Sequence, residues 1–470
     1  MNSNNIYRYY LKNTTVFLIS SLVSIGAALI VTNPIILFVF SLLLISLLLN
    51  RRIMIVLIII SNLIATGPDL QDYRIYINLF SATVFGYYFA SDFGMKFNSY
   101  PKIPSKILKL IVFFLITILI SSIFSINKVV SIIAFLRTLS FFIFSYLIYT
   151  QIKDDKDIKY LLIAFGIAQL FLGASIYYEF FQKGIGFFIG KEALFRLAGI
   201  YGNPNYVGLL LAITIPITLS FLMLKFVEKL VNNLFLILIL LFQLGMLLLS
   251  DSRASFLSIA ISSVVILWFS PKKSRRNFLY IIAGISIVLI FVSNLNNIIE
   301  IFLRLERIST RDDFWKTGIE ILKNNLLFGT GADTFEQMFF SKAPSNLIHL
   351  LKVSPSGVGT PHPHNIFLYF WAENGILGVI SIFMIFYISL KLSIELLQID
   401  VVENKLYFII TISNISIVSG LFFRAFFEIT GIMTYGAITR DLPFWVLLII
   451  LCHIYQKNHS LKIERNSNKT

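Results

Sequence analysis

Two of the five histidines in this chain lie one residue apart, in TPHPHNIFLYFWAENGILG (residues 360 to 378). Prolines flank His362, and the second of them directly precedes His364, so the backbone here is stiff. A neutral imidazole can accept a proton from an attacking hydroxyl group near neutral pH. A histidine before a helix is more often a cap or an interfacial anchor, so both roles stay open for His364. Glu373 follows in an apolar run, where its carboxyl group should find a partner, either Arg424 or a backbone donor.

Two arginines are placed to bind an anion. Arg253 lies in SDSRAS (residues 250 to 255), where one apolar run ends and the next begins, and Arg311 opens RDDFWKTGIEILKNN. A guanidinium group binds phosphate oxygens through two parallel hydrogen bonds, and the N–H groups of a helix start add to an anion site. For Arg253, snorkelling to lipid headgroups stays open as the simpler alternative. We interpret Arg304 and Arg307 as a solvated basic patch and favour a functional role for Arg311.

The residues around Arg311 predict an amphipathic helix. Ser309 or Thr310 can cap its start, and Asp312 and Asp313 suit the positive end of the helix dipole. One face is apolar, formed by Phe314, Trp315, Gly318, Ile319 and Leu322, so this helix should lie on another part of the protein. Because helix-start chemistry explains the two aspartates, and no further acidic residue or histidine lies at ligand spacing nearby, the sequence predicts no metal site and no cofactor.

The composition indicates the fold class. Of the 470 residues, 57% are hydrophobic and 13% are charged, and the apolar residues form long runs such as VFLISSLVSIGAALIV and FLYIIAGISIVLIFV. Runs near ~20 residues cross a bilayer as helices, whereas barrel strands would show segments of ~10 residues with alternating polarity. We therefore expect an all-α polytopic membrane protein with about 12 to 14 transmembrane helices. The candidate centres lie near residues 23, 42, 59, 84, 116, 140, 168, 214, 241, 262, 287, 384, 415 and 448.

The formal net charge of +15 is distributed as expected for membrane topology. Basic blocks such as RR, KIPSKILK, KDDKDIK and PKKSRR lie between apolar runs, which is not the pattern of a nucleic-acid groove. With an uncleaved first span and a cytoplasmic N-terminus, the positive-inside rule places every candidate chemical cluster on the extracytoplasmic side. The single cysteine, Cys452, excludes an internal disulfide.

One connection, from about residue 297 to 364, is much longer than the others. A connection of this length with its own helix and apolar patches predicts an extracytoplasmic subdomain on the membrane surface. The predicted organisation has three parts. Residues 1–190 form N-terminal transmembrane helices, residues 191–430 form a region that includes the long loop, and residues 431–470 form the last span and a basic cytoplasmic tail.

Four motifs in order resemble the O-antigen ligase and polymerase superfamily of bacterial envelope proteins. They are RLAGIYGNPNYVG (196 to 208), SDSRAS (250 to 255), RDDFWKTGIEILKNNLLFGTGADTF (311 to 335) and PHPHNIFLYFWAENGILG (361 to 378). The resemblance covers about residues 190 to 430. Its most specific part is the final His-Asn, aromatic or apolar, Glu-x-Gly-x-x-Gly pattern.

This resemblance implies an enzyme of the bacterial inner membrane. It would transfer a glycan from undecaprenyl pyrophosphate to lipid A core or another terminal acceptor on the periplasmic face. Carried onto this sequence, the family's roles make Arg253 and Arg311 the pyrophosphate ligands and His364 the residue that assists the acceptor hydroxyl. We expect five further residues at the substrate site, namely Arg196, Asn203, His362, Asn365 and Glu373. The implied partners are the lipid-linked glycan, a glycan or lipid acceptor and membrane lipid, with no nucleic acid.

Three alternatives stay open. A polysaccharide polymerase would use the same donor chemistry but would pass the glycan to a second lipid-linked repeat unit. A lipid or glycan transporter should show repeated halves and ionisable groups near the bilayer midplane, where Arg137 is the main candidate here. A structural membrane protein without chemistry would require that Arg253, Arg311 and His364 are all dispensable.

Overall fold

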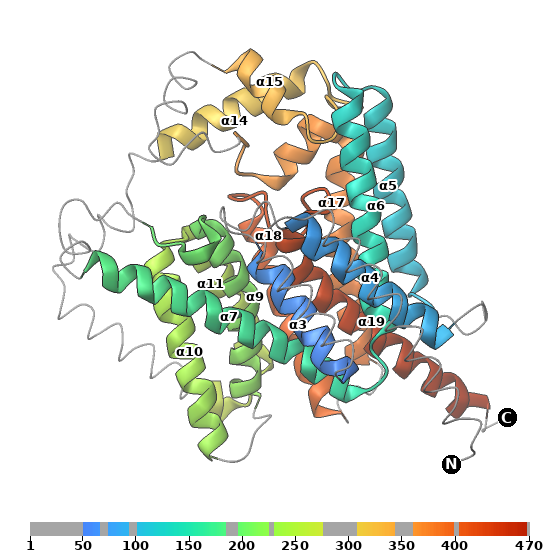
Figure 1. The fold of residues 1–470 in the computed structure, drawn as a ribbon, viewed down its shortest axis with the longest axis vertical. Coiled ribbons are helices and arrows are strands. Elements are labelled where there is room, and N and C mark those ends of the chain that lie inside the picture. The colour runs from blue at the N-terminus through green and yellow to red at the C-terminus, as the bar shows by residue number, and fades with distance from the viewer. Residues whose placement is uncertain are drawn as a thin grey trace, which may run out of the picture.

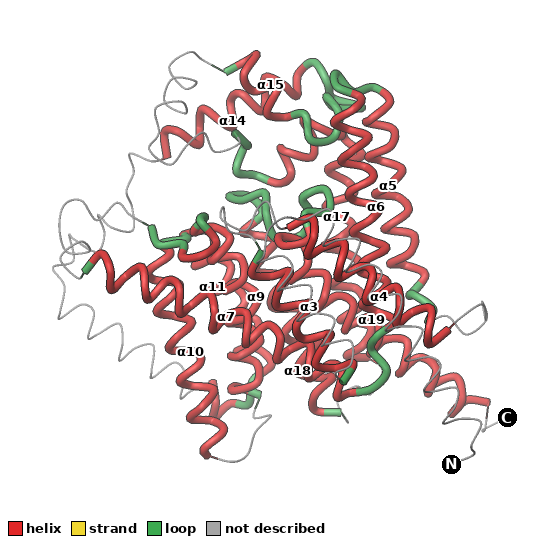
Figure 2. Tube along the Cα trace, in the orientation of Figure 1, coloured by secondary structure: helices red, strands yellow, loops and turns green. Residues whose placement is uncertain are grey.

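Helices form all of the regular structure in the described part of the chain. The computed structural model describes residues 50–65, 74–93, 101–184, 196–224, 230–275, 308–343, 361–398 and 404–467. Within these ranges no strand occurs, which confirms the predicted all-α class (Figures 1 and 2). The helices are α3 (Arg51–Ile64), α4 (Arg74–Phe93), α5 (Ser105–Ile123), α6 (Lys128–Thr150), α7 (Asp155–Lys183), the short 3-10 helix η3 (Gly199–Tyr201), α9 (Pro204–Met223), α10 (Leu230–Ser250), α11 (Arg253–Phe269), α14 (Ile308–Lys323), α15 (Phe335–Lys342), α17 (Ile366–Gln398), α18 (Lys405–Arg424) and α19 (Ile438–Ser467).

Eight of the described helices are long and apolar enough to cross a membrane, namely α5, α6, α7, α9, α10, α17, α18 and α19. Shorter apolar stretches occur in α4 (Tyr76–Gly86) and as α11 (Arg253–Phe269). The chain is therefore a multi-pass membrane protein, as predicted. The predicted spans near residues 23, 42 and 287 lie outside the described residues.

Short polar side chains set several of the helix starts. Asp154 and Asp157 form a capping box at the start of α7. Asn203 accepts a hydrogen bond from the N–H group of Asn205 at the start of α9, where Pro204 occupies the first helical position. These residue types favour helix starts because they satisfy N–H groups that have no partner within the helix, and proline has no N–H to satisfy.

The helix α17 is too long for a single span, and its backbone breaks. Its 33 residues would measure ~50 Å as one helix, whereas the hydrocarbon core of a bilayer is ~30 Å thick. The backbone leaves helical geometry at Gly375, with φ at 63° and ψ at −161°. Residues 376–398 are long enough to cross the membrane, and residues 366–374 form a shorter helix before them. His364 therefore precedes this short helix.

The helix α14 packs against α15 and α17, so the prediction that it lies on another part of the protein is confirmed (Figure 1). The predicted cap is wrong, because α14 begins at Ile308 and Ser309 and Thr310 lie inside it. Helix ends readily extend by one or two residues past a polar residue that sequence alone marks as a cap. On the predicted apolar face Phe314 is 8% exposed, but Ile319 is 48% exposed.

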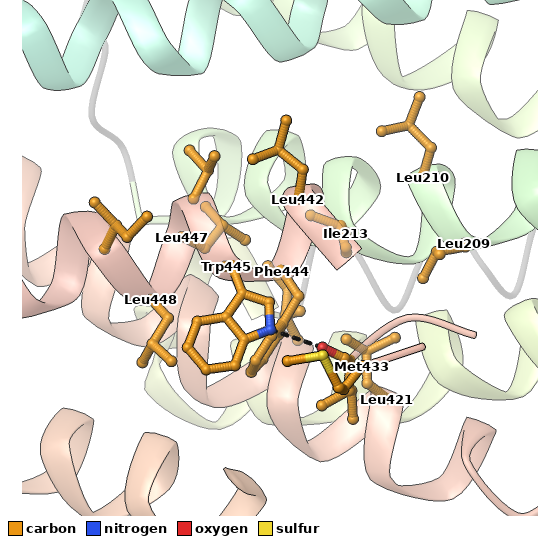
Figure 3. Packing of buried hydrophobic residues seen from close by; sticks show 14 of the residues in the cluster. Leu209, Leu210, Ile213, Leu421, Met433, Leu442, Phe444, Trp445, Leu447 and Leu448 are labelled. Atoms are coloured by element: carbon orange, nitrogen blue, oxygen red, sulfur yellow. Dashed lines mark hydrogen bonds between the residues drawn. The ribbon is translucent and has the colours of Figure 1, made fainter. Parts of the chain in front are cut away.

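A buried aromatic cluster fixes the segment between α18 and α19. The indole N–H group of Trp445 donates a hydrogen bond to the carbonyl group of Ile432 at 2.8 Å. Figure 3 shows Trp445 among the buried hydrophobic residues that surround it. The Trp445 ring also packs edge to face against Phe142 of α6, with 5.0 Å between ring centroids. Leu209 and Leu421 belong to the same buried cluster, so α9 and α18 hold this segment as well.

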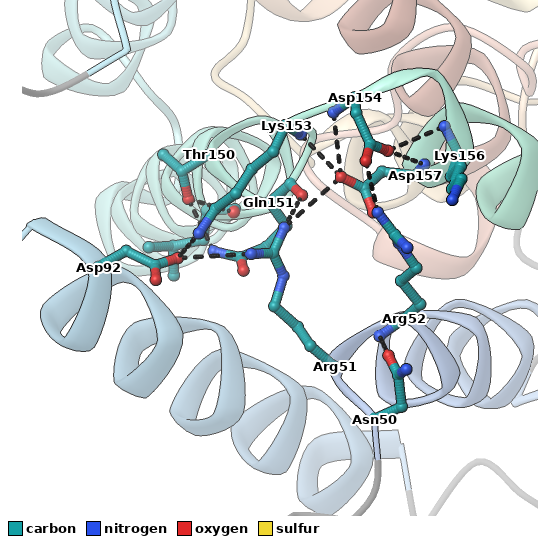
Figure 4. Close-up of polar contacts among 11 residues, drawn as sticks. Asn50, Arg51, Arg52, Asp92, Thr150, Gln151, Lys153, Asp154, Lys156 and Asp157 are labelled. Atoms are coloured by element: carbon teal, nitrogen blue, oxygen red, sulfur yellow. Dashed lines mark hydrogen bonds and ion pairs between the residues drawn. The ribbon is translucent and has the colours of Figure 1, made fainter. Parts of the chain in front are cut away.

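Ion pairs join α3, α4 and α7 at the end of the bundle where α7 begins (Figure 4). Arg52 pairs with Asp157 at 2.8 Å and with Asp154 at 2.5 Å, and Lys153 pairs with Asp92 at 2.7 Å. The 29 residues of α7 then extend about 44 Å towards the opposite end of the bundle. The predicted basic blocks RR and KDDKDIK therefore meet in space, far from the other end of α7.

Candidate functional site

The predicted site residues gather at the end of the bundle where α9, α11 and α17 begin and α18 ends, which we call the site end. The N–H group of Ile366 donates to the carbonyl group of Ala425 at 2.9 Å, which joins the start of α17 to the end of α18. The buried guanidinium group of Arg424 donates to the carbonyl group of Asn205 at 3.0 Å and to the hydroxyl group of Ser255 at 3.3 Å. Four segments that are far apart in the sequence thus meet around Arg424.

His364 is half-buried at the site end between two other rings. Its φ angle is 47°, a left-handed value that is uncommon for residues other than glycine. The His362 ring lies 4.1 Å away between centroids, and the Phe314 ring of α14 lies 5.8 Å away in a T-shaped arrangement. The side-chain oxygen of Asn365 accepts a hydrogen bond from the N–H group of Leu368 at 3.0 Å, so Asn365 caps the start of α17.

Glu428 faces His364 and is not among the site residues predicted from the sequence. Its carboxylate oxygen Oε1 lies 3.6 Å from His364 Nδ1, and its side chain is 2% exposed. Burial opposes ionisation of this group, but the His364 imidazole, and then Arg424 and His362, lower the pKa of Glu428 to about 2. The only signal in the sequence was the pair of charges in RAFFE (424 to 428), which interrupts an apolar region.

Arg253 is the first residue of α11, two residues before Ser255, which contacts Arg424. The hydroxyl groups of Ser252 and Ser255 lie 2.9 Å apart and form a hydrogen bond. A Cβ atom at Gly208 of α9 would collide with both serine side chains. The start of α11 is therefore packed directly on the start of α9. The side chain of Arg253 is half-buried, and none of the hydrogen bonds or ion pairs found among the described residues involves its guanidinium group.

Arg196 and Asn203 are already engaged in contacts within the protein. Arg196 donates to the carbonyl group of Ser250 at 3.2 Å and to the side-chain oxygen of Asn205 at 2.7 Å. Asn203 Oδ1 accepts from the N–H group of Asn205 at 2.8 Å. These contacts join the end of α10 to the start of α9. Both residues therefore shape the site end next to Arg253.

Arg311 belongs to α14, but its side chain lies outside the described residues, as do Arg304 and Arg307. The helix contacts the His364 segment and α17. Phe314, one turn further along, contacts His364, and a side chain at Gly318 would collide with Leu368 of α17. The backbone of α14 therefore passes directly over the His364 segment.

Glu373 is fully buried, and its carboxyl group holds the Gly-rich turn LLFGTGADTF. It accepts hydrogen bonds from the backbone N–H groups of Asp333, at 3.0 Å, and Phe335, at 2.7 Å. The predicted alternatives were Arg424 or a backbone donor, and the structure shows backbone donors. These bonds attach the turn and the start of α15 to α17, the helix that His364 precedes.

Arg137, the midspan charge of the transporter alternative, also binds this turn. It donates to the carbonyl group of Tyr435 at 2.7 Å and pairs with Asp333 at 3.0 Å. Its guanidinium group thus joins α6 to the Gly-rich turn and to the segment before α19. These partners give Arg137 a structural role.

A cavity of about 580 Å³ lies away from His364, between α7, α9 and α10. Its lining is apolar apart from Gln169, Thr214, Thr218 and Gln243, and it contains no ionisable side chain. Among the described residues no group of three or more His, Cys, Asp or Glu side chains is arranged to hold a metal ion. This cavity therefore offers no candidate acid, base or cation.

A family comparison agrees with this geometry. Residues 234–383 match the model of the O-antigen ligase family. The chain thus has an O-antigen ligase-like region. The match confirms the resemblance predicted from the motifs, and the family is one of glycan-transferring enzymes whose general partners are lipid-linked glycans and glycan acceptors. A search of curated proteins found no match.

The ligase-like region contains Arg253, Arg311, His362, His364, Asn365 and Glu373. Arg196 and Asn203 precede it, and Arg424 and Glu428 follow it. The fold brings both flanking segments back to the site end, because α9 and α18 pack against α11 and α17. The site is therefore assembled from more of the chain than the matched region.

Proposed function

We propose that this protein transfers a glycan from a polyprenyl pyrophosphate, undecaprenyl pyrophosphate in a bacterial inner membrane, to lipid A core or another terminal acceptor. The observation that carries the proposal is the convergence at the site end of a histidine backed by a buried carboxylate and an arginine without a protein partner among the described residues. These are the groups that transfer from a lipid pyrophosphate requires, namely a base and a fixed cation. The family match supports the same reaction class.

The reaction can be written with these groups. The acceptor hydroxyl oxygen forms a bond to the anomeric carbon of the glycan, and the bond from that carbon to the pyrophosphate oxygen breaks. The acceptor proton passes to Nε2 of His364, because Nδ1 faces Glu428. Polyprenyl pyrophosphate leaves with an added negative charge, which Arg253 and Arg311 stabilise through charge-assisted hydrogen bonds.

The distribution of charge supports an extracytoplasmic site. The basic residues Arg51, Arg52 and Lys153 gather where α7 begins, and the side chain of Glu179, near the other end of α7, accepts a hydrogen bond from the N–H group of Gly199 next to the site end. Clusters of Lys and Arg mark the cytoplasmic ends of membrane helices. The site end then faces the periplasm, where no nucleotide sugar is available and the energy for transfer must reside in the lipid-linked donor.

The test is transfer in proteoliposomes supplied with undecaprenyl-pyrophosphate-linked glycan and one acceptor at a time. Arg253→Ala should reduce release of undecaprenyl pyrophosphate ~100-fold or more, as expected for loss of one preorganised donor to a developing charge. Arg275→Ala is the matched control, because Arg275 lies beyond the opposite end of α11 and donates to the carbonyl group of Trp268. It should retain full activity.

The products separate the two activities that share this chemistry. Glycosylated lipid A core, or another terminal acceptor, would identify a ligase, and a lengthened lipid-linked glycan would identify a polymerase instead. If the folded protein releases no undecaprenyl pyrophosphate with any of these acceptors, the proposed function is wrong. Equal activity of Arg253→Ala and Arg275→Ala would exclude Arg253 as a pyrophosphate ligand.

A further inference from the structure

We propose that Glu428 is the positioning residue of His364, holding the Nδ1 edge of the imidazole so that the Nε2 edge faces the acceptor hydroxyl. This inference rests on the proposed function and adds a residue that lies outside the ligase-like region. It assigns Glu428 no contact with the glycan or with the pyrophosphate. Its role is exerted through His364.

Three contacts restrict the orientation of the His364 ring. Glu428 Oε1 lies 3.6 Å from Nδ1, the His362 ring lies 4.1 Å away between centroids, and the Phe314 ring lies 5.8 Å away. The separation of 3.6 Å exceeds that of a hydrogen bond, and such contacts between catalytic groups commonly shorten when substrate binds. The carboxylate is the group that faces Nδ1, so it favours the Nδ1–H form of the ring.

Burying a carboxylate such as that of Glu428 costs free energy unless other groups compensate its charge. The charged or titratable groups near Glu428 are His364 and His362 from the segment before α17, Arg424 from the end of α18 and Tyr206 from α9. From α14 the contact on His364 is Phe314, which does not titrate. When His364 accepts a proton from the acceptor, the new positive charge lies against the Glu428 carboxylate.

The backbone of Glu428 is bonded to Arg424, which also contacts the first turn of α11. The N–H group of Glu428 donates to the carbonyl group of Arg424 at 3.0 Å. Arg424 in turn donates to Ser255, two residues after Arg253, and to Thr430. The backbone of Glu428 and the first turn of α11, which begins with Arg253, are therefore both bonded to Arg424. This arrangement fixes where the proton acceptor lies relative to the leaving group.

The experiment compares Glu428→Gln, Glu428→Asp and His364→Ala in the proteoliposome assay, with kcat and KM for the donor as readouts. Glu428→Gln should lower kcat at least ~10-fold, which is less than the ~10²–10⁴-fold that a general base contributes, while KM changes little. Glu428→Asp keeps the charge on a shorter side chain and should lower kcat less than Glu428→Gln does. Glu336→Gln, which removes an exposed carboxylate from α15, is the matched control.

The outcomes distinguish this inference from the proposed function. If His364→Ala is inactive while Glu428→Gln keeps the wild-type kcat, Glu428 has no positioning role and the proposed function stands. If His364→Ala is as active as the wild type, His364 is not the base and the inference is also wrong. Should Glu428→Gln fail to fold, Glu428→Asp decides, since a lowered kcat with an unchanged KM supports positioning and an unchanged kcat contradicts it.

Discussion

Phe314 and His364 meet in a T-shaped contact, with 5.8 Å between ring centroids and 79° between ring planes. This contact joins the helix α14 to the segment that carries the proposed base. Phe314 is itself stacked on Phe339 of α15, at 5.1 Å. The orientation of His364 therefore depends on the packing of the whole α14 and α15 pair.

Phe314→Ala should lower kcat for glycan transfer by about 10-fold or more, because small displacements of a catalytic group are costly in rate. Ile319→Ala is the control on the same helix, since Ile319 is 48% exposed and makes no contact with His364. Both variants would be assayed in proteoliposomes. Equal rates for the two would show that the ring contact does not position His364.

Loss of the Glu373 carboxyl group should destabilise the Gly-rich turn. Glu373→Ala leaves the buried N–H groups of Asp333 and Phe335 without their acceptor, at a cost of about 3 kcal/mol or more. Glu373→Gln retains one acceptor oxygen and should cost less. Thermal unfolding of the purified protein in detergent would measure both. An unchanged melting temperature for Glu373→Ala would contradict the anchoring role of this side chain.

Gly375 should not tolerate a side chain. Its φ angle is 63°, and a Cβ atom there would overlap the backbone carbonyl group of Leu327. We expect Gly375→Ala to destabilise the protein by more than about 2 kcal/mol. Gly166 of α7 is the control, because a Cβ atom there meets no other atom within 4 Å, and Gly166→Ala should be neutral or stabilising by up to ~1 kcal/mol. Similar melting temperatures for the two variants would contradict the tight junction at Gly375.

The Glu428 carboxylate should make stability depend on pH in the acid range. Burial opposes its ionisation, but His364, Arg424 and His362 lower the pKa from 4.5 to about 2 in the folded protein. The folded state then binds this proton more weakly than the unfolded state. The stabilisation is therefore complete above about pH 4.5 and is lost as the pH falls towards 2.

Melting temperatures measured between pH 6 and pH 3 would test this dependence. The difference between the wild type and Glu428→Gln should be greatest near pH 6 and should shrink as the pH falls. Glu336→Gln, with its exposed carboxylate, should follow the wild type over the whole range. A difference that grows on acidification would show that the sign is wrong.

Much of the fold could be predicted from the sequence because membrane helices are specified locally. An apolar run of ~20 residues satisfies its own backbone hydrogen bonds and needs only the bilayer as its environment. The eight long spans of the described residues and the general position of α14 follow from such runs. The motifs around Arg253, Arg311 and His364 likewise indicated the family that the comparison matched.

The tertiary structure decided which polar groups meet. In the sequence, Glu428 is a charged residue that follows the apolar run of α18, with no sign of a partner. The packing of α17 against α18 brings it to His364. Glu373 had two candidate partners in the sequence, and the break at Gly375 together with the Gly-rich turn provided the backbone donors. Local patterns report the environment of one helix at a time, whereas these contacts join segments that are distant in sequence. The sequence by itself therefore determined the helices and the reaction class to consider, and the packing of those helices determined the surroundings of each candidate site residue.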